Sequence, residues 1–256
     1  NETELAPSNV RDVKVSFPRG LAVNPAAASG LQACTPAQIG MTTVVGQGSP
    51  SFTRARPQCP DGSKIGTVEV NTPLLDHPVP GAVYAAQPYQ NPFGTLLCVY
   101  VVIDSPQDGL AVKLAGKTEA DPNTGQLTAT FTENPQLPFS SFNVELFGGP
   151  RAVLRTPSTC GTFATTSEQT PWSGNPAVPT SDSFQITSGP NGSPCSSNEA
   201  QQPNNPGFDA GTLTPIAGSY SPFLGRLQRN DGEQQIKALN LTLPPGLSGK
   251  LAGVAT

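Results

Sequence analysis

The residues that could carry out catalysis are few and lie apart in the sequence. The only histidine, His77, stands in the proline-flanked segment LLDHPVPG, next to Asp76. A hydrolytic triad needs a histidine base that faces both a nucleophile and a carboxylate, and no GxSxG turn occurs. We therefore expect His77 to be an exposed loop residue. The 18 acidic residues are scattered, mostly in turns, so a jelly-roll glycosidase with two facing carboxylates is only the lesser alternative.

Two patterns could bind a metal ion, and both are incomplete. Zinc sites use clustered cysteines and histidines, but the chain has no CxxC pair and a single histidine. Glu119, Asp121 and Asn123 precede Gly125 in a way that resembles the start of a calcium loop, without the later bidentate glutamate. We predict a turn between two strands there, no metal site and no cofactor.

The five cysteines indicate disulfide chemistry instead. Cys34, Cys59, Cys160 and Cys195 lie in turn-like surroundings, whereas Cys98 lies within the apolar run LLCVYVVI. Four cysteines allow three pairings, and proximity in the sequence favours Cys34 with Cys59 and Cys160 with Cys195. Cys98 is expected to be a free, buried and inert thiol. Disulfides would place the chain in an oxidising compartment outside the cytoplasm.

The single tryptophan offers a binding hypothesis. Trp172 lies in the segment 166–182, which is polar and is expected to be a long loop. An exposed ring there could stack on a sugar, and the competing interpretation is that the ring anchors the loop to the domain. Adhesion or carbohydrate binding through 166–182 is therefore the second functional hypothesis.

Composition excludes other classes of partner. Charged residues make up only 12% of the chain, against roughly 25% in an ordinary soluble domain. The 14 lysines and arginines do not cluster, so the chain lacks the basic stripe of a nucleic-acid-binding protein. No apolar run approaches the roughly 20 residues of a membrane-spanning helix.

The pattern of apolar residues predicts an all-β fold. Short alternating runs separated by turns that contain many of the 29 prolines and 26 glycines are typical of a sandwich or barrel. We predict a large antiparallel β-sandwich, immunoglobulin-like or jelly-roll-like, with long loops and one or two short helical turns. Thr35 and Pro36 would begin one such turn. The strands are expected near 10–17, 65–70, 82–86, 95–103, 110–114, 127–131, 142–146, 152–155, 163, 184–186, 211–215, 221–229 and 236–243.

One pattern occurs twice. VKVSFPRGL at 13–21 and LNLTLPPGL at 239–247 match in their apolar and polar positions, and Pro, Gly and Leu recur in place. The plain explanation is that strands often end in Pro-x-Gly. The sharper hypothesis is that Leu239, Leu241 and Leu243 repeat the roles of Val13, Val15 and Phe17 in a second copy of the module. An Asn-Asp-Gly turn at 230–232 would pair 221–229 with 236–243 as a hairpin.

These blocks resemble uncharacterised, very large secreted proteins of soil actinobacteria. The segments that carry the resemblance are VKVSFPRGLAVNP, CPDGSKIGTVEV and AGTLTPIAGSYSPFLGRLQRNDGEQQIKALNLTLPPGLSGKLAGV. In those proteins the same blocks recur in tandem. The resemblance implies secretion, tandem repetition and the two disulfide pairs already favoured by proximity. It implies no catalytic residues.

We therefore expect a non-catalytic structural module of an extracellular or cell-surface protein. Residues 1–195 would form the sandwich, 196–207 a linker, and 208–256 the opening strands of a second repeat or a strand that complements a neighbouring copy. Other copies of the module, joined covalently or as separate subunits, are the expected partners. Glycans are the second candidate partner.

Overall fold

A computed structural model describes residues 8–24, 30–230, 233–234 and 236–249. The described chain divides into two compact units. The first comprises Asn1–Pro157 with Thr162–Gln185, and the second comprises Ser158–Gly161 with Ile186–Thr256.

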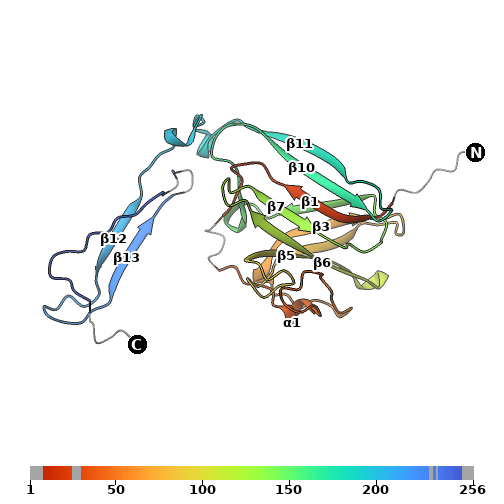
Figure 1. The fold of residues 1–256 in the computed structure, drawn as a ribbon, viewed down its shortest axis with the longest axis horizontal. Coiled ribbons are helices and arrows are strands. Elements are labelled where there is room, and N and C mark those ends of the chain that lie inside the picture. Colours follow the sequence, from red (N-terminus) through yellow and green to blue (C-terminus); the bar gives the residue numbers. More distant parts are fainter. Residues whose placement is uncertain (1–7, 25–29, 231–232, 235, 250–256) are drawn as a thin grey trace, which may run out of the picture. The chain divides into compact units, whose positions relative to one another are not determined.

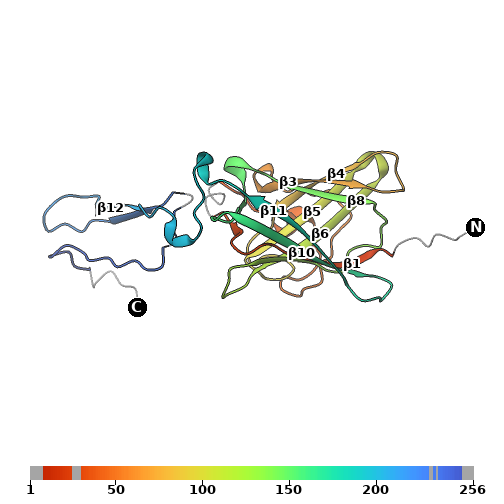
Figure 2. The same ribbon diagram turned by 90° about the horizontal axis from the view of Figure 1, so that it is seen from above.

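The main element is a curled antiparallel sheet of nine strands (Figures 1 and 2). From one edge to the other the order is β11-β10-β1-β7-β6-β5-β4-β3-β8. The predicted all-β, antiparallel fold with long loops and short helical turns is confirmed. The strands are β1 (Val10–Ser16), β3 (Lys64–Asn71), β4 (Val79–Ala85), β5 (Leu97–Ser105), β6 (Leu110–Ala120), β7 (Leu127–Phe131), β8 (Ser141–Leu146), β10 (Gly161–Pro171) and β11 (Val178–Ile186).

Smaller elements complete the description. β2 (Ala22–Val23) pairs with β9 (Leu154–Arg155), and β12 (Gly207–Thr212) pairs with β13 (Phe223–Gln228). One short α-helix, α1, spans Pro36–Ile39. The 3-10 turns are η2 (Asp61–Ser63), η3 (Pro106–Asp108), η4 (Gly149–Arg151), η5 (Pro190–Gly192) and η6 (Glu199–Gln201). No helix within the described ranges is long and apolar enough to cross a membrane.

The central strand β5 is buried on both faces. Cys98, Tyr100 and Val102 point into one apolar cluster, and Val101 and Ile103 point into another. Tyr100 has no exposed surface. A strand covered on both sides needs apolar residues at nearly every position, which explains why 96–103 is a continuous apolar run rather than an alternating one.

Residues 34–59 form a covering segment that packs on one face of β5 and includes α1 near its start. Thr35 caps this helix: its Oγ1 accepts the amide of Gln38 at 3.3 Å, and Gln38 Oε1 accepts the amide of Thr35 at 2.9 Å. Pro36 occupies the first turn, where its missing N–H costs nothing. Gly40 ends the helix with a φ of 73°, a left-handed conformation that favours glycine. The expectation for Thr35 and Pro36 is confirmed.

Lys113 of β6 holds the rest of this covering segment. Its Nζ donates to the carbonyl oxygens of Ile39 at 2.8 Å, Thr53 at 3.2 Å and Ala55 at 2.5 Å. Partial burial lowers the pKa of Lys113, and the carboxylate of Asp104 opposes that shift. One side chain therefore pairs carbonyl groups that a long loop would otherwise leave unpaired.

Two local expectations are wrong. The segment 166–182 is mostly a hairpin, because β10 continues to Pro171 and β11 begins at Val178. Its polar residues fit because β11 is an edge strand exposed along nearly its whole length. The hairpin expected around 230–232 is also wrong, since β13 pairs with β12 and residues 236–243 form no strand where the structure describes them. Residues 231–232 themselves lie outside the described residues.

Replacing Lys113 by methionine keeps the aliphatic stem and removes the three donated hydrogen bonds. We expect Lys113→Met to lower the free energy of unfolding by about 1.5–3 kcal/mol, since hydrogen bonds to charged groups are the strong ones. Urea denaturation and protease sensitivity of residues 40–58 measure this effect. Lys14→Met is the matched control, because Lys14 is exposed and its Nζ lies 3.4 Å from Glu168; it should change stability by less than about 0.5 kcal/mol. Equal losses in both variants would contradict this role.

Candidate functional site

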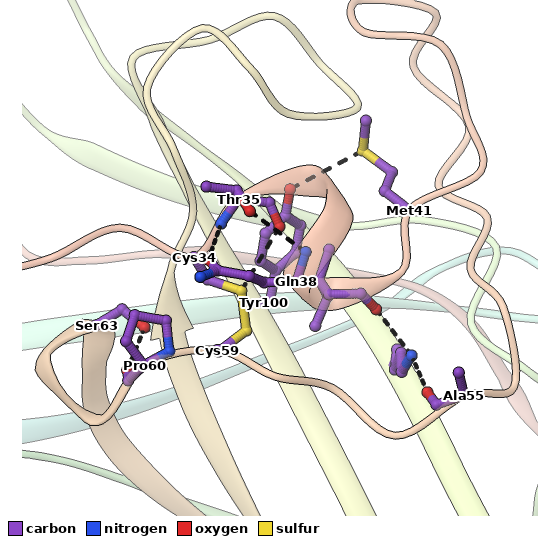
Figure 3. Close-up of a disulfide and its surroundings, with 11 residues drawn as sticks. Cys34, Thr35, Gln38, Met41, Ala55, Cys59, Pro60, Ser63 and Tyr100 are labelled. Carbon is purple, nitrogen blue, oxygen red and sulfur yellow. Dashed lines mark hydrogen bonds between the residues drawn. A yellow bond between two sulfur atoms is a disulfide. The ribbon is translucent and has the colours of Figure 1, made fainter.

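The two disulfides are the pairs expected from the sequence. Cys34 bonds to Cys59 with a Cα–Cα distance of 4.9 Å, and Cys160 bonds to Cys195 with 5.5 Å. Figure 3 shows the first bond beside the capped turn at Thr35 and Gln38. Cys34 is completely buried and its amide donates to Ala85 at 2.8 Å. The backbone of Cys34 therefore attaches the covering segment to β4, and the first disulfide ties the end of that segment at Cys59 to the same point. The second disulfide joins the two stretches of chain that make up the second unit.

Cys98 is the free thiol within the described part of the chain, and it is buried. Burial raises its pKa to about 12. The reactive form of cysteine is the thiolate, so this residue is an apolar core side chain at neutral pH, as expected.

His77 lies near acidic and hydroxyl groups in an order that does not match a hydrolytic triad. Its Nε2 is 3.5 Å from Asp108 Oδ1, and the hydroxyl of Ser105 bonds to the other carboxylate oxygen. A triad requires the histidine between the carboxylate and the nucleophile, whereas here Asp108 stands between Ser105 and His77. The His77 side chain is 38% exposed, so it is a half-exposed residue rather than a fully solvated one.

The turn at 121–125 uses its carboxylate internally. Asp121 Oδ1 accepts the amides of Asn123 and Thr124 at 3.0 and 2.7 Å and the Thr124 hydroxyl at 2.8 Å. These donors lower the pKa of Asp121, and Gly125 takes a φ of 69°. The segment is the strand-connecting turn predicted from its sequence. Across the described residues no three histidine, cysteine or acidic side chains are grouped to hold a metal ion.

The predicted assembly residues Val13 and Val15 lie in the interior of the large sheet. β1 sits between β7 and β10: Val13 is opposite Phe131 and Gln169, and Val15 is opposite Ala129 and Ser167. Phe17 continues the pairing, with its amide donating to Leu127 at 2.9 Å. All three side chains are partly buried.

The matching segment in the second unit has no such surroundings. Leu239, Leu241 and Leu243 are 60%, 51% and 46% exposed, and no described strand pairs with them. They still alternate with polar residues, as a half-buried strand requires. The segment therefore has the sequence pattern of a strand, but the described residues give it neither a covering surface nor a partner strand.

The hairpin that precedes this segment also exposes an apolar face. Phe208 is opposite Leu227, and Phe223 is opposite Thr212, so the three apolar side chains share one face of β12 and β13. They are 49%, 41% and 40% exposed. Polar residues such as Asp209 and Arg226 lie on the other face. An isolated two-stranded sheet is marginal in water.

The base of the second unit is held by polar contacts instead. Gln202 is buried, and its Nε2 donates to Ser158 Oγ at 2.6 Å. Gln234 donates to the carbonyl of Gln202 at 2.9 Å, and Arg229 donates to the carbonyl of Glu233 at 2.7 Å. Segment 196–207, expected as a linker, therefore carries a 3-10 turn and contacts within its own unit.

Trp172 lies beside a groove in the first unit and is 38% exposed. The groove has a volume of about 480 Å³ and is lined by Arg11, Asp12, Gln47, Gly48, Ser49, Thr132, Glu133 and Trp172. Of these residues, the sequence indicates only Trp172 as a binding residue. The others come from three separate segments, and no local pattern predicts that they meet.

Comparison with known proteins gives no relative for this chain. No protein-family model, no curated protein and no solved structure matches it.

The raised pKa of Cys98 predicts how stability changes at alkaline pH. The buried thiol must stay protonated in the native chain up to a pH of about 12, whereas an unfolded cysteine ionises near 9.0. Its contribution to stability is therefore fully present below pH 9 and falls as the pH rises toward 12. Urea denaturation measures the free energy of unfolding at pH 8 and at pH 10. The fall in this free energy from pH 8 to pH 10 should be smaller in Cys98→Ser than in the parent chain. Equal losses would contradict this account of Cys98, as would rapid alkylation of the native thiol at pH 8.

Proposed function

We propose that this chain is a non-catalytic structural module of an extracellular repeat protein, in which residues 239–247 form the β1-type strand of a following copy. The observation that carries the proposal is the exposed, alternating apolar segment at Leu239, Leu241 and Leu243, with which no described strand pairs. Its sequence matches β1, which lies between β10 and β7 in this module's own sheet.

The occupied position of β1 decides which form of the proposal is physically possible. In this module the space between β7 and β10 is already filled by Val10–Ser16. A neighbouring chain cannot insert residues 239–247 there while β1 remains in place. The proposal therefore requires a following copy in which 239–247 is itself the first strand of the sheet, in the place of β1, as in covalently joined repeats.

Other features support a structural role outside the cytoplasm. Two disulfides fit an oxidising compartment. The low charge and the many prolines suit a chain that must resist unfolding and proteolysis for long periods. Exposed apolar surface on both β12–β13 and 236–247 is what a segment awaiting a partner should have.

The test is a two-module chain in which 239–247 is the sole candidate for the first strand of the second sheet. In this designed chain residues 1–247 are followed directly by residues 22–195. Residues 239–247 then replace 13–21 of the second module, because Leu247 aligns with Leu21. We predict that the second module folds and that the amides of 239–243 are protected from hydrogen exchange. Leu241→Asp should unfold the second module, since it places a charge where Val15 packs, at a cost of at least about 2 kcal/mol.

Three controls make this result interpretable. A chain that joins residues 1–238 to 13–195 supplies the native first strand and shows that the junction tolerates a folded module. Asn240→Asp adds the same charge at the position of exposed Lys14 and should have a small effect. Leu241→Asp in the 256-residue chain should leave its stability unchanged. The proposed role is wrong if the control that joins 1–238 to 13–195 folds its second module and the chain that joins 1–247 to 22–195 does not. It is also wrong if the second module of the latter chain still folds after Leu241→Asp.

A further inference from the structure

The groove beside Trp172 has the features of a binding site, and the structural role proposed above does not use it. It lies entirely within the first unit, where four segments meet. Arg11 and Asp12 come from β1, Thr132 and Glu133 follow β7, and Trp172 follows β10. Gln47, Gly48 and Ser49 of the covering segment complete the lining.

The tryptophan ring is held in a fixed orientation. Its Nε1 donates to the carbonyl oxygen of Asn134 at 2.9 Å, and its backbone amide donates to the carbonyl of Asn9 at 2.9 Å. These two bonds fix the edge and the backbone of Trp172 and leave part of the ring exposed. An apolar ring that stays 38% exposed while its polar atom is satisfied is suited to stack on a ligand.

The backbone around the groove departs from regular strand geometry at two points. The pairing of β1 with β10 shifts register between Val10 and Asp12, which leaves Arg11 in a bulge. Glu133 has a φ of 54°, in the left-handed region that non-glycine residues seldom occupy. Bulges re-aim side chains, and such backbone strain is concentrated at functional sites.

Hydrogen bonds hold this irregular backbone in place. Asp12 Oδ1 accepts the amide of Glu133 at 2.9 Å, and the carbonyl of Arg11 accepts both the amide and the Nδ2 of Asn134 at 2.8 Å. The same Asp12 carboxylate pairs with the Nε of Arg11 at 2.8 Å. The Glu133 side chain is exposed and has no hydrogen bond or ion pair within the described residues.

These groups define the chemistry of the ligand. The Trp172 ring offers a flat apolar surface, while Gln47, Ser49 and Glu133 offer donors and acceptors beside it. A pyranose presents the same combination, with an apolar C–H face and a rim of hydroxyl groups. Arg11 and Asp12 neutralise each other, and Glu133 leaves one net negative charge, which disfavours acidic sugars.

The geometry points to a binding site for neutral glycans at this groove, with Trp172 stacking on a sugar ring and Glu133 accepting its hydroxyl groups. The site would let the module attach to an uncharged polysaccharide, in addition to any role in assembly. Its position in the first unit makes it independent of residues 239–247.

Because Trp172 is the one tryptophan of the chain, its fluorescence reports directly on the groove. The 256-residue chain is first screened on a glycan array that carries neutral hexose, N-acetylhexosamine and uronate oligosaccharides. The same oligosaccharides are then titrated into the chain in solution while its tryptophan emission is recorded. We expect saturable binding of a neutral class with a change in tryptophan emission, and none of the uronates. Glu133→Gln should weaken binding about tenfold.

Substitutions of the ring complete the test on the array. Trp172→Ala should weaken array binding at least about tenfold. Trp172→Phe keeps an aromatic surface if the alanine variant does not fold, and it should retain more binding than Glu133→Gln. Tyr89→Asn is the matched control: Tyr89 is 58% exposed, has a φ of 59° and lies outside the groove, and asparagine tolerates that conformation. The inference is overturned if no neutral glycan binds or if only uronates bind. It is also overturned if Trp172→Ala and Glu133→Gln bind glycans as the parent does. Tetramethylammonium, a cation without hydroxyl groups that can stack on an aromatic ring, is titrated in parallel, and the same saturable change in emission with it would equally overturn the inference.

Discussion

A β-strand persists only when neighbouring strands take up its backbone hydrogen bonds and another surface covers its apolar side chains. The first unit of this protein meets both conditions in the interior of its nine-stranded sheet, where β5 is covered on both faces. The second unit meets them only in part. Its described hairpin pairs β12 with β13 but leaves Phe208, Phe223 and Leu227 exposed. No described strand pairs with the segment from Leu239 to Leu243. This contrast is the basis of the functional account.

The cover over β5 depends on a few strong attachments rather than on regular structure. Residues 34–59 contain one four-residue helix, so their backbone groups cannot all pair with one another. The Cys34–Cys59 disulfide fixes both ends of the segment, and Lys113 pairs carbonyl groups in its middle. A low-charge chain rich in proline and glycine can thus build a core under a loop. The same loop supplies Gln47 and Ser49 to the groove at Trp172.

The sequence predicts strands whose burial shows in the order of their own residues. It does not predict features that depend on which strands become neighbours. Alternation located most strands, and the buried run at 96–103 identified β5, because burial on one or both faces is written into successive residues. The sequence predicts a loop at 166–182, because an exposed edge hairpin has no apolar face that would indicate strands. The pattern at 236–243 is that of a strand, yet a strand needs neighbours. The groove required β1, β7 and β10 to be adjacent, and sheet order is not visible in one sequence.

Register-specific crosslinking tests the central claim most directly. In this module Val15 of β1 stands opposite Ala129 of β7, and Leu241 aligns with Val15. In the chain that joins residues 1–247 to 22–195, cysteine is placed at Leu241 and at Ala129 of the second module. Opposed strand residues lie within disulfide range, so a bond should form there and not with cysteine at Thr130, whose side chain lies on the other face. A bond to Thr130 in place of Ala129, or to neither, would contradict the claim that 239–247 takes the place of β1.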